Sequence, residues 1–207
     1  MKLVDMKVND YLDVLKSDAP APGGGSASAL AAAQGIALVG MVCELTLGKE
    51  KYAEYQETCM AVKEEVDQLY IKLVEAIDKD TEAFNLVSAA FKMPKNTDEE
   101  KAVRSKAIAD GTLVATEVPF ETMMLCVEGL KITEKAVGRS NPNAASDLGV
   151  AALGLLNGVK GAWLNVLINL PVIKDEALKE KFMTGRKIII EAEAAAARIY
   201  AEVASML

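Results

Sequence analysis

The stretch Val62–Phe91 reads VKEEVDQLYIKLVEAIDKDTEAFNLVSAAF, and its apolar residues recur at intervals of three or four positions. This spacing is typical of one face of a helix and predicts a long helix over about Tyr52–Phe91. The pattern is unbroken only if Asp80 fills the step between Ile77 and Phe84. A carboxylate is therefore expected in an apolar seam, where burial without a partner is costly.

The composition of the whole chain also favours helices. Hydrophobic residues make up 51 % of the 207 residues but aromatic residues only 5 %, so Ala, Val, Leu and Ile must build the core. Strands draw more heavily on aromatic and β-branched residues, whereas Ala and Leu are strong helix formers. Neither a Gly/Ser-rich linker nor an internal repeat divides the sequence. We predict a single all-α domain over residues 1–207, built as a bundle of long helices.

Turn residues and caps divide the chain into six predicted helices. Thr97 and Glu100 form a capping-box pattern at the start of the fourth helix, in which Pro119 predicts a kink. The other predicted helices are a short one over 8–15, an Ala-rich one capped by Ser26 or Ser28, the long helix up to Phe91, one from Ser146–Asp147 to before Pro171, and one from Asp175 to the C-terminus. The helix before Pro171 is apolar on nearly all sides, which predicts a homodimer or higher oligomer.

Charge and residue types narrow the classes of function. The net charge is -7, and no Lys/Arg cluster with interleaved aromatic residues is present, so nucleic acid is not expected as a partner. The chain has no histidine, the commonest metal ligand and the usual acid/base near neutral pH. Catalysis without metal or imidazole would have to use carboxylates, Lys, Tyr, amides or backbone groups.

Three features indicate a cytoplasmic protein. Cys43, Cys59 and Cys126 are widely spaced in apolar helical stretches, which favours buried thiols in a reducing compartment over redox or nucleophilic roles. The first residues, 1–18, lack the apolar run of a signal peptide. The apolar stretches 26–47 and 148–170 are interrupted by polar residues, so they are interpreted as helices surrounded by protein and not as membrane spans.

Two features near the start of the chain could carry chemistry. Gly23–Gly25 and Ser26 precede a helix, where backbone amides can bind an anion or a carbonyl oxygen; a tight corner between two helices explains them equally well. Asp80 in the apolar seam is suited to general acid/base catalysis, because desolvation raises the pKa of a carboxyl group. The alternative is a structural ion pair with Arg104 or Arg139.

Two further features lie later in the sequence. The fifth predicted helix carries small and amide side chains at helical spacing, which favours a surface that lines a ligand over helix packing alone; its members are Asp147, Ala151, Gly154, Gly158, Gly161, Asn165 and Asn169. Asn143 lies just before this helix, where capping is the simpler explanation. Lys92, Lys95 and Arg104 are the best local basic group, although a solvated loop explains isolated lysines.

Four motifs occur in an order that is similar to a known family. They are PAPGGGSASAL from Pro20, DKDTEAFNLVSAAFKMPK from Asp78 with the following Arg104, NPNAASDLGVAA from Asn141, and NVLIN from Asn165. Together they resemble the cyclodeaminase/cyclohydrolase family of tetrahydrofolate enzymes, which includes the C-terminal domain of formiminotransferase-cyclodeaminase and free-standing methenyltetrahydrofolate cyclohydrolases. The resemblance covers essentially the whole chain.

This resemblance implies an all-helical homodimer with folate sites at the subunit interface and no prosthetic group. It also implies that the matching positions border the site: Gly23, Gly24, Gly25, Ser26, Asp80, Lys95, Arg104, Asn143, Asp147 and Asn165. We expect Asp80 first and Asp147 second as the catalytic carboxylates. The amides are expected to hold the pterin, and the basic residues or glycine amides the glutamyl tail.

Two reactions and one non-catalytic role follow as hypotheses. The leading one is hydrolysis of 5,10-methenyltetrahydrofolate to 10-formyltetrahydrofolate. The second, within the same family, is cyclodeamination of formiminotetrahydrofolate with release of ammonia. A non-catalytic folate-binding or scaffold protein is the alternative of another class, and a metalloenzyme is disfavoured because carboxylates alone would have to supply its ligands.

Overall fold

The structure is a computed structural model that describes residues 2–207, and every regular element in this range is a helix. The predicted all-α class is confirmed. The α-helices are α1 (Val8–Leu15), α2 (Gly24–Glu44), α3 (Gln56–Phe91), α4 (Asp98–Ala136), α5 (Ala145–Asn169), α6 (Glu176–Met183) and α7 (Gly185–Met206). Short 3-10 turns are η1 (Leu3–Asp5), η2 (Glu50–Tyr55), η3 (Pro142–Ala144) and η4 (Leu170–Val172).

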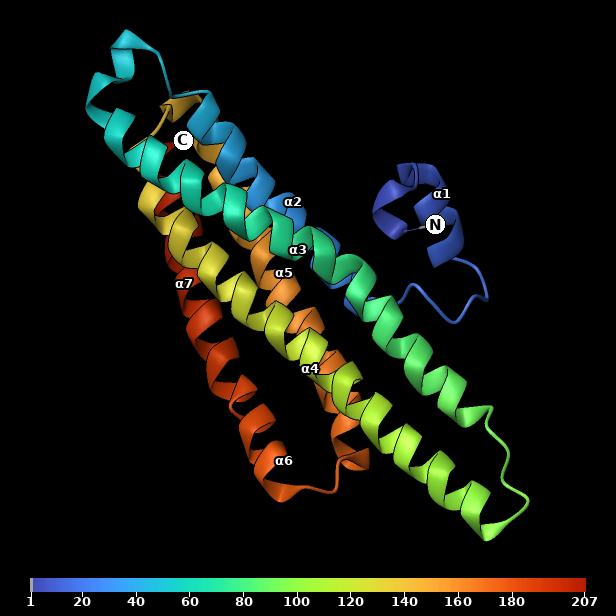
Figure 1. The fold of residues 1–207 in the computed structure, drawn as a ribbon. Helices are drawn as coiled ribbons and strands as arrows, with labels where there is room; N and C mark the ends of the chain where they lie inside the picture. The colour runs from blue at the N-terminus through green and yellow to red at the C-terminus, as the bar shows by residue number, and fades with distance from the viewer. Residues whose placement is uncertain (1) are drawn as a thin grey trace.

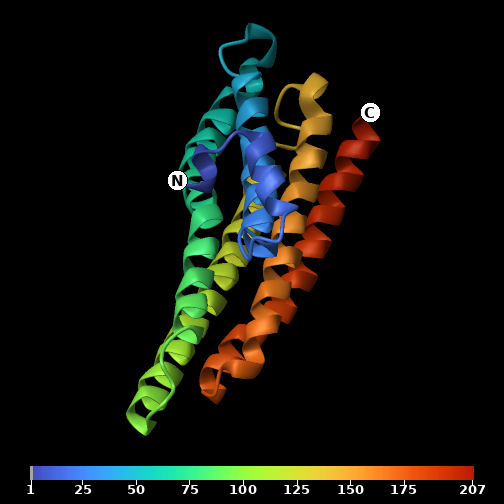
Figure 2. The same ribbon diagram turned by 90° about the vertical axis from the view of Figure 1, so that its right-hand side faces the viewer.

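The long helices α2, α3, α4, α5 and α7 run side by side around one core (Figure 1). Helix α2 packs against both α3 and α5, and α4 packs against the same two helices from the other side. The tip of the α3–α4 hairpin extends beyond the N-terminal end of α2 (Figure 1). Helix α1 lies to one side of the other helices (Figures 1 and 2). The core is aliphatic, as the composition predicts; its largest fully buried side chains include Ile36, Leu69, Leu73, Met123, Leu148 and Leu155.

Helix α3 confirms the predicted apolar face as far as Ile77 but not at two later aromatic positions. Val62, Leu69 and Ile77 are buried, as predicted from their spacing. Phe84 and Phe91, in contrast, are 38 % and 57 % exposed. The two rings have different surroundings: Phe84 borders a cavity, and Phe91 lies near the tip of the α3–α4 hairpin, where Arg104 of α4 stacks on it.

The start of α2 differs from the prediction. Neither Ser26 nor Ser28 caps the helix; α2 begins at Gly24, and its N-cap, Gly23, has no side chain with which to bond. The first N–H groups of a helix lack partners within the helix and must find them elsewhere. The N–H group of Ser26 donates to Asp80 of α3. A carboxylate from another helix therefore caps α2, in place of the predicted serine.

The C-terminal segment also differs from the prediction of one helix. It is divided into α6 and α7, with the boundary at Thr184 and Gly185. A Cβ atom on Gly185 would lie 2.4 Å from the ring of Trp163 in α5, so only glycine lets the chain pass this close. The capping box of Thr97 and Glu100 is confirmed at the start of α4.

The cysteines and the most apolar helices lie inside the fold. The three thiols are free and buried, as predicted, and burial raises the pKa of Cys43 and of Cys126 to about 12. Gly24–Glu44 and Pro142–Val172 are long and apolar enough to cross a membrane by composition. Of the most apolar window in each, 61 % and 44 % respectively is buried within the protein. More than half of the residues in the second window are therefore exposed or only half-buried in a single chain.

Candidate active site

The carboxylate of Asp80 lies at the N-terminus of α2. Its Oδ2 atom accepts a hydrogen bond from the backbone N–H of Ser26 at 2.9 Å and lies 3.2 Å from the Ser26 hydroxyl. That hydroxyl also lies 2.8 Å from the carbonyl oxygen of Ile77, one turn before Asp80. The ion pair with Arg104 or Arg139 is not formed within residues 2–207. The contacts to Ser26 therefore hold one carboxylate oxygen and leave Oδ1 without a hydrogen-bond partner from the described residues.

Gly25 lets the carboxylate approach the helix. A Cβ atom at this position would lie 1.9 Å from Asp80 Oδ1 and 2.3 Å from its Cγ. Any larger residue would therefore have to displace the carboxylate. Of the two explanations for the glycine triplet, the close approach of two helices is observed here, and the approaching group is a carboxylate that lines a cavity.

Two asparagines on the last turns of α5 face the same region. Asn165 donates from Nδ2 to the Gly161 carbonyl at 2.9 Å, and Asn169 donates from Nδ2 to the carbonyls of Ala115 at 2.9 Å and of Asn165 at 3.1 Å. A carbonyl oxygen only accepts hydrogen bonds, so the NH2 group of each amide must point toward it. The Oδ1 atoms of both side chains are left without a partner among residues 2–207.

These groups surround one cavity of about 320 Å³. Its walls come from the loop before α2, the second half of α3, the middle of α4 and the end of α5. The lining residues are Pro20, Ala21, Gly23, Gly24, Asp80, Phe84, Val87, Ala115, Asn165, Ile168 and Asn169. The side chains thus offer three unpaired acceptor oxygens, from Asp80, Asn165 and Asn169, and no cationic group. Such a lining suits a ligand that carries N–H donors or a positive charge.

Burial changes the acid strength of Asp80. Desolvation raises its pKa above the ordinary value, and the hydrogen bonds from the side chain and backbone of Ser26 partly oppose that rise. Tyr11 of α1 is close enough for the charge of Asp80 to contribute, after burial, to raising the pKa of the phenol. The Tyr11 hydroxyl is buried and unpaired in the part of the chain described here. An acid/base role for Asp80 remains a prediction, in a setting whose electrostatics suit it.

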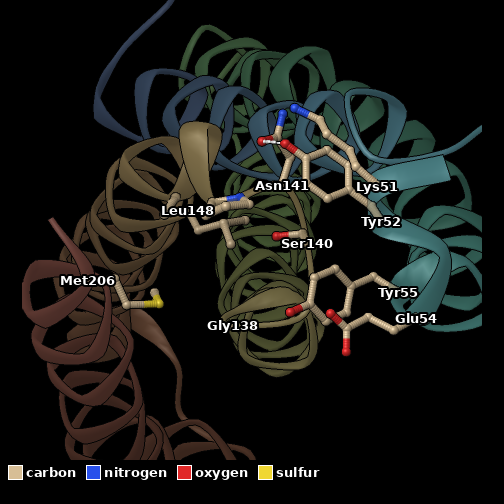
Figure 3. A pocket seen from close by; sticks show the side chains of 11 residues that line it. Lys51, Tyr52, Glu54, Tyr55, Gly138, Ser140, Asn141, Leu148 and Met206 are labelled. Atoms are coloured by element: carbon tan, nitrogen blue, oxygen red, sulfur yellow. Dashed lines mark hydrogen bonds between the residues drawn. The ribbon is translucent and has the colours of Figure 1, made fainter. Parts of the chain in front are cut away.

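A second cavity, of about 490 Å³, lies at the other end of α5 (Figure 3). Tyr52, Tyr55, Leu148 and Met206 surround it, together with Asn141 at the start of η3. Here two of the polar side chains bond to each other. The Tyr52 hydroxyl donates to Asn141 Oδ1, which also accepts from the backbone N–H of Asn143.

The remaining predicted site residues lie away from Asp80 within one chain. Asp147 and Asn143 are near the start of α5, and Asp147 is 18 positions, or about 27 Å of helix, from Asn165. Lys95 is exposed in the loop between α3 and α4. Arg104 donates to the carbonyl of Phe91 and stacks on its ring, near the tip of the hairpin. The structure brings together Gly23–Ser26, Asp80 and Asn165, and it does not bring the other four residues to them within one chain.

Three contributors were absent from the residues predicted for the site. Asn169 belongs to the small and amide face, and its helical spacing from Asn165 is the signal that relates it to the site. Tyr11 looked like an ordinary apolar-face residue, and nothing in the sequence relates α1 to Asp80. Ala115 contributes through its backbone carbonyl, which leaves no signal in residue type. In residues 2–207, no group of three or more Cys, Asp or Glu side chains is arranged to hold a metal ion.

Comparison with known proteins identifies the family. A family model described as formiminotransferase-cyclodeaminase matches residues 7–187. The chain belongs to this family, as its motifs suggested.

Relatives within the family carry two different names. A methenyltetrahydrofolate cyclohydrolase from Methylorubrum extorquens is 41 % identical over 199 residues, which cover 96 % of each chain. A formimidoyltransferase-cyclodeaminase from Rattus norvegicus is 34 % identical over 179 residues, which are 86 % of this chain but 33 % of the rat protein. The crystal structure of a formiminotetrahydrofolate cyclodeaminase from Thermotoga maritima superimposes with a TM-score of 0.80 at 27 % identity, covering 98 % of this chain and 96 % of that one.

Proposed function

We propose that this protein is a methenyltetrahydrofolate cyclohydrolase, which converts 5,10-methenyltetrahydrofolate and water to 10-formyltetrahydrofolate in one-carbon metabolism. The observation that carries the proposal is the cavity at the N-terminus of α2, where Asp80, Asn165 and Asn169 each present an unpaired acceptor oxygen. The methenyl carbon lies between two nitrogens that share a positive charge. A carboxylate and two amide oxygens stabilise that charge and accept hydrogen bonds from the ring N–H groups.

The relatives support the same choice of reaction. The Methylorubrum cyclohydrolase aligns with 96 % of this chain over 96 % of its own length. The rat enzyme, in contrast, aligns with this chain over only a third of its length.

In this proposal Asp80 performs both proton transfers. Water adds to the methenyl carbon, and Asp80 Oδ1 accepts a proton from that water, which leaves a neutral carbinolamine. The bond from this carbon to N5 then breaks as N5 receives the proton from Asp80. The hydroxyl group loses its proton to solvent and becomes the formyl oxygen. The net result consumes one water and releases one proton, and the raised pKa of Asp80 brings its proton exchange closer to neutral pH.

Cyclodeamination is the second candidate. It is favoured by the Thermotoga cyclodeaminase, which has the same fold over nearly the whole chain. In that reaction N10 attacks the formimino carbon of formiminotetrahydrofolate, and the departing nitrogen leaves as ammonia after protonation. A carboxyl group with a raised pKa is a suitable acid for this step.

The active form in this proposal is a homodimeric helical bundle. Uncovered apolar side chains follow one face of α2 and α5, which we call the α2/α5 face; it includes Met41, Leu45, Val150, Leu153, Leu164 and Ile168. A groove of about 740 Å³ runs between the two helices on this face. A contiguous apolar surface of this kind is typical of a subunit interface.

An antiparallel dimer would also unite the predicted site residues. Asp147 and Asn165 are five helical turns apart, so both project from the same side of α5. A two-fold axis across the middle of the α2/α5 face exchanges the two ends of α5. Asp147 of the partner subunit then comes near Asn165 and Asp80, which is where the family resemblance places it.

Other parts of the proposal concern the tail and the compartment. Lys95 and Arg104 are near the exposed tip of the α3–α4 hairpin, where a flexible anionic glutamyl tail can reach them. The buried free thiols fit a reducing cytoplasm. The partners proposed are the folate substrate and a second copy of the chain; nucleic acid, a membrane and a prosthetic group are not among them.

The reaction is tested by giving the purified protein each substrate and following the absorbance of the methenyl group. The proposal expects loss of the chromophore well above the uncatalysed rate. Formation of the chromophore from formiminotetrahydrofolate, with hydrolysis no faster than background, would instead make the protein a cyclodeaminase. Absence of both activities, with folate still bound, would leave a non-catalytic binding protein.

The shared site is tested by mixing two inactive variants, Asp80→Asn and Asp147→Asn, under conditions that exchange subunits. In an antiparallel dimer, one of the two sites in each mixed dimer has both native carboxylates, so equal mixing should restore about a quarter of wild-type activity. No restoration is expected if each site uses one chain only. Leu153→Glu should give monomers by light scattering, whereas Ile190→Glu, at a position that is 66 % exposed on α7, should not.

A further inference from the structure

Pro119 lies in the middle of α4, yet α4 continues unbroken from Asp98 to Ala136. Proline has no backbone N–H, so the carbonyl four residues earlier loses its helical partner. That carbonyl belongs to Ala115, which lines the cavity beside Asp80. A buried or half-buried carbonyl left in this way needs another donor.

The donor is the side chain of Asn169 at the end of α5. Its Nδ2 atom donates to Ala115 O at 2.9 Å and to Asn165 O at 3.1 Å, so both amide hydrogens are used. With both hydrogens held, the amide plane is fixed and Oδ1 is the only free polar atom of this side chain. Asn165 is held less firmly, because its Nδ2 has a single bond, to Gly161 O in its own helix.

We propose that Pro119 is a positioning residue for substrate binding, acting through the Ala115 carbonyl and the Asn169 amide. The missing N–H at Pro119 frees the carbonyl, the carbonyl orients the amide, and the amide presents Oδ1 to the cavity as a fixed acceptor. A fixed acceptor selects a ligand edge that carries N–H donors, such as the aminopyrimidine edge of a reduced folate. The identity of this ligand rests on the proposed function, whereas the orientation of Asn169 by Pro119 does not.

The informative substitution is Pro119→Ala. Residue 119 then gains an N–H that bonds to Ala115 O within α4, so the Asn169 amide must share an acceptor that it otherwise holds alone, and its orientation is less firmly fixed. We expect KM to rise about tenfold while kcat stays within about twofold, since one neutral hydrogen bond in binding is affected. The Tm should not fall, because proline in a helix interior is unfavourable relative to alanine.

A double-mutant cycle separates this role from general packing. Asn169→Ala should raise KM at least as much as Pro119→Ala, and adding Pro119→Ala to it should cause little further change. Asn85→Ala removes an exposed amide from α3 and serves as the matched control, with unchanged KM. An unchanged KM in Pro119→Ala, or an effect that is fully additive with Asn169→Ala, would overturn the proposal.

A measurement without ligand makes failure of this inference distinguishable from failure of the proposed function. The side-chain NH2 signals of Asn169, assigned by their loss in Asn169→Ala, should shift and exchange faster with solvent in Pro119→Ala. If they do so but the protein neither binds nor converts methenyltetrahydrofolate, the positioning role stands and the proposed substrate is wrong. Signals identical to wild type would overturn the positioning role itself.

Discussion

The two ends of α5 carry similar residues in opposite states of hydrogen bonding. At the start of the helix, the Asn141 amide accepts from Tyr52 and from the N–H of Asn143 and donates to the Leu45 carbonyl. At the end, Asn165 and Asn169 use their NH2 groups on backbone carbonyls and leave both oxygens unpaired. These half-buried oxygens lie on a cavity wall, where a ligand can supply the donors that the chain does not. Within one chain, the Asn141 amide at the first end is satisfied internally, whereas the amide oxygens at the second end are open to a ligand.

The substitution Asp80→Asn, beside the end of α5 that is open to a ligand, should have the largest effect on activity. The amide retains an oxygen that can accept the Ser26 N–H but cannot take a proton from water, so kcat should fall about 10²- to 10⁴-fold. The fall in kcat is measured by following the methenyl absorbance with the purified variant. Circular dichroism confirms that the variant is folded. Full activity in this variant would remove Asp80 from the mechanism.

Gly25→Ala should have the next largest effect. The added Cβ would lie 1.9 Å from Asp80 Oδ1, so the carboxylate must swing away from its position at α2. We expect a loss of about 10²-fold in kcat/KM from the misplaced base. Gly23→Ala adds a methyl group to the same cavity wall without meeting Asp80, since a Cβ there has nothing within 4 Å, and its loss should be much smaller. Equal losses of kcat/KM in both variants would mean that activity depends on the glycine turn and not on the close approach of Gly25 to Asp80.

Asn141→Ala tests the opposite end of α5. It leaves the buried Tyr52 hydroxyl without its acceptor, which should lower the free energy of unfolding by about 2 kcal/mol. Urea unfolding measures this change. At a temperature where the variant is folded, KM should rise only modestly, since Asn141 affects Asn143 and Asp147 only by holding the turn that precedes them. A large rise in KM with unchanged stability would reverse the two assignments.

The smallest effect concerns pH. Burial raises the pKa of Asp80 in the folded protein, so its contribution to stability is fully present below its ordinary pKa of about 4 and is lost as pH rises through the raised folded value. Asp80→Asn should therefore reduce the fall in stability over that window, as measured by Tm against pH. The acid limb of kcat/KM in the wild type should lie above pH 4 for the same reason. A wild-type limb at or below that pH would show that Asp80 titrates normally.

Local patterns predicted the helices well and their ends less well. The spacing of Val62 to Ile77 placed α3 and its buried face, and the capping box at Thr97 placed the start of α4. The start of α2 was misassigned because its capping partner, Asp80, comes from 54 residues later in the chain. The C-terminal break at Gly185 was missed because its cause is the ring of Trp163 in another helix.

The sequence alone determined the all-helical class, the family and the presence of an acid in an apolar seam. The class follows from composition, the acid from residue spacing along one helix, and the family from the order of its motifs. Only the tertiary structure decided which oxygens are left free at the cavity. That depends on contacts between helices, such as Ser26 with Asp80 and Ala115 with Asn169, in which backbone atoms take part. Backbone groups are the same in every residue, so their pairing across the fold leaves no mark in the amino-acid sequence.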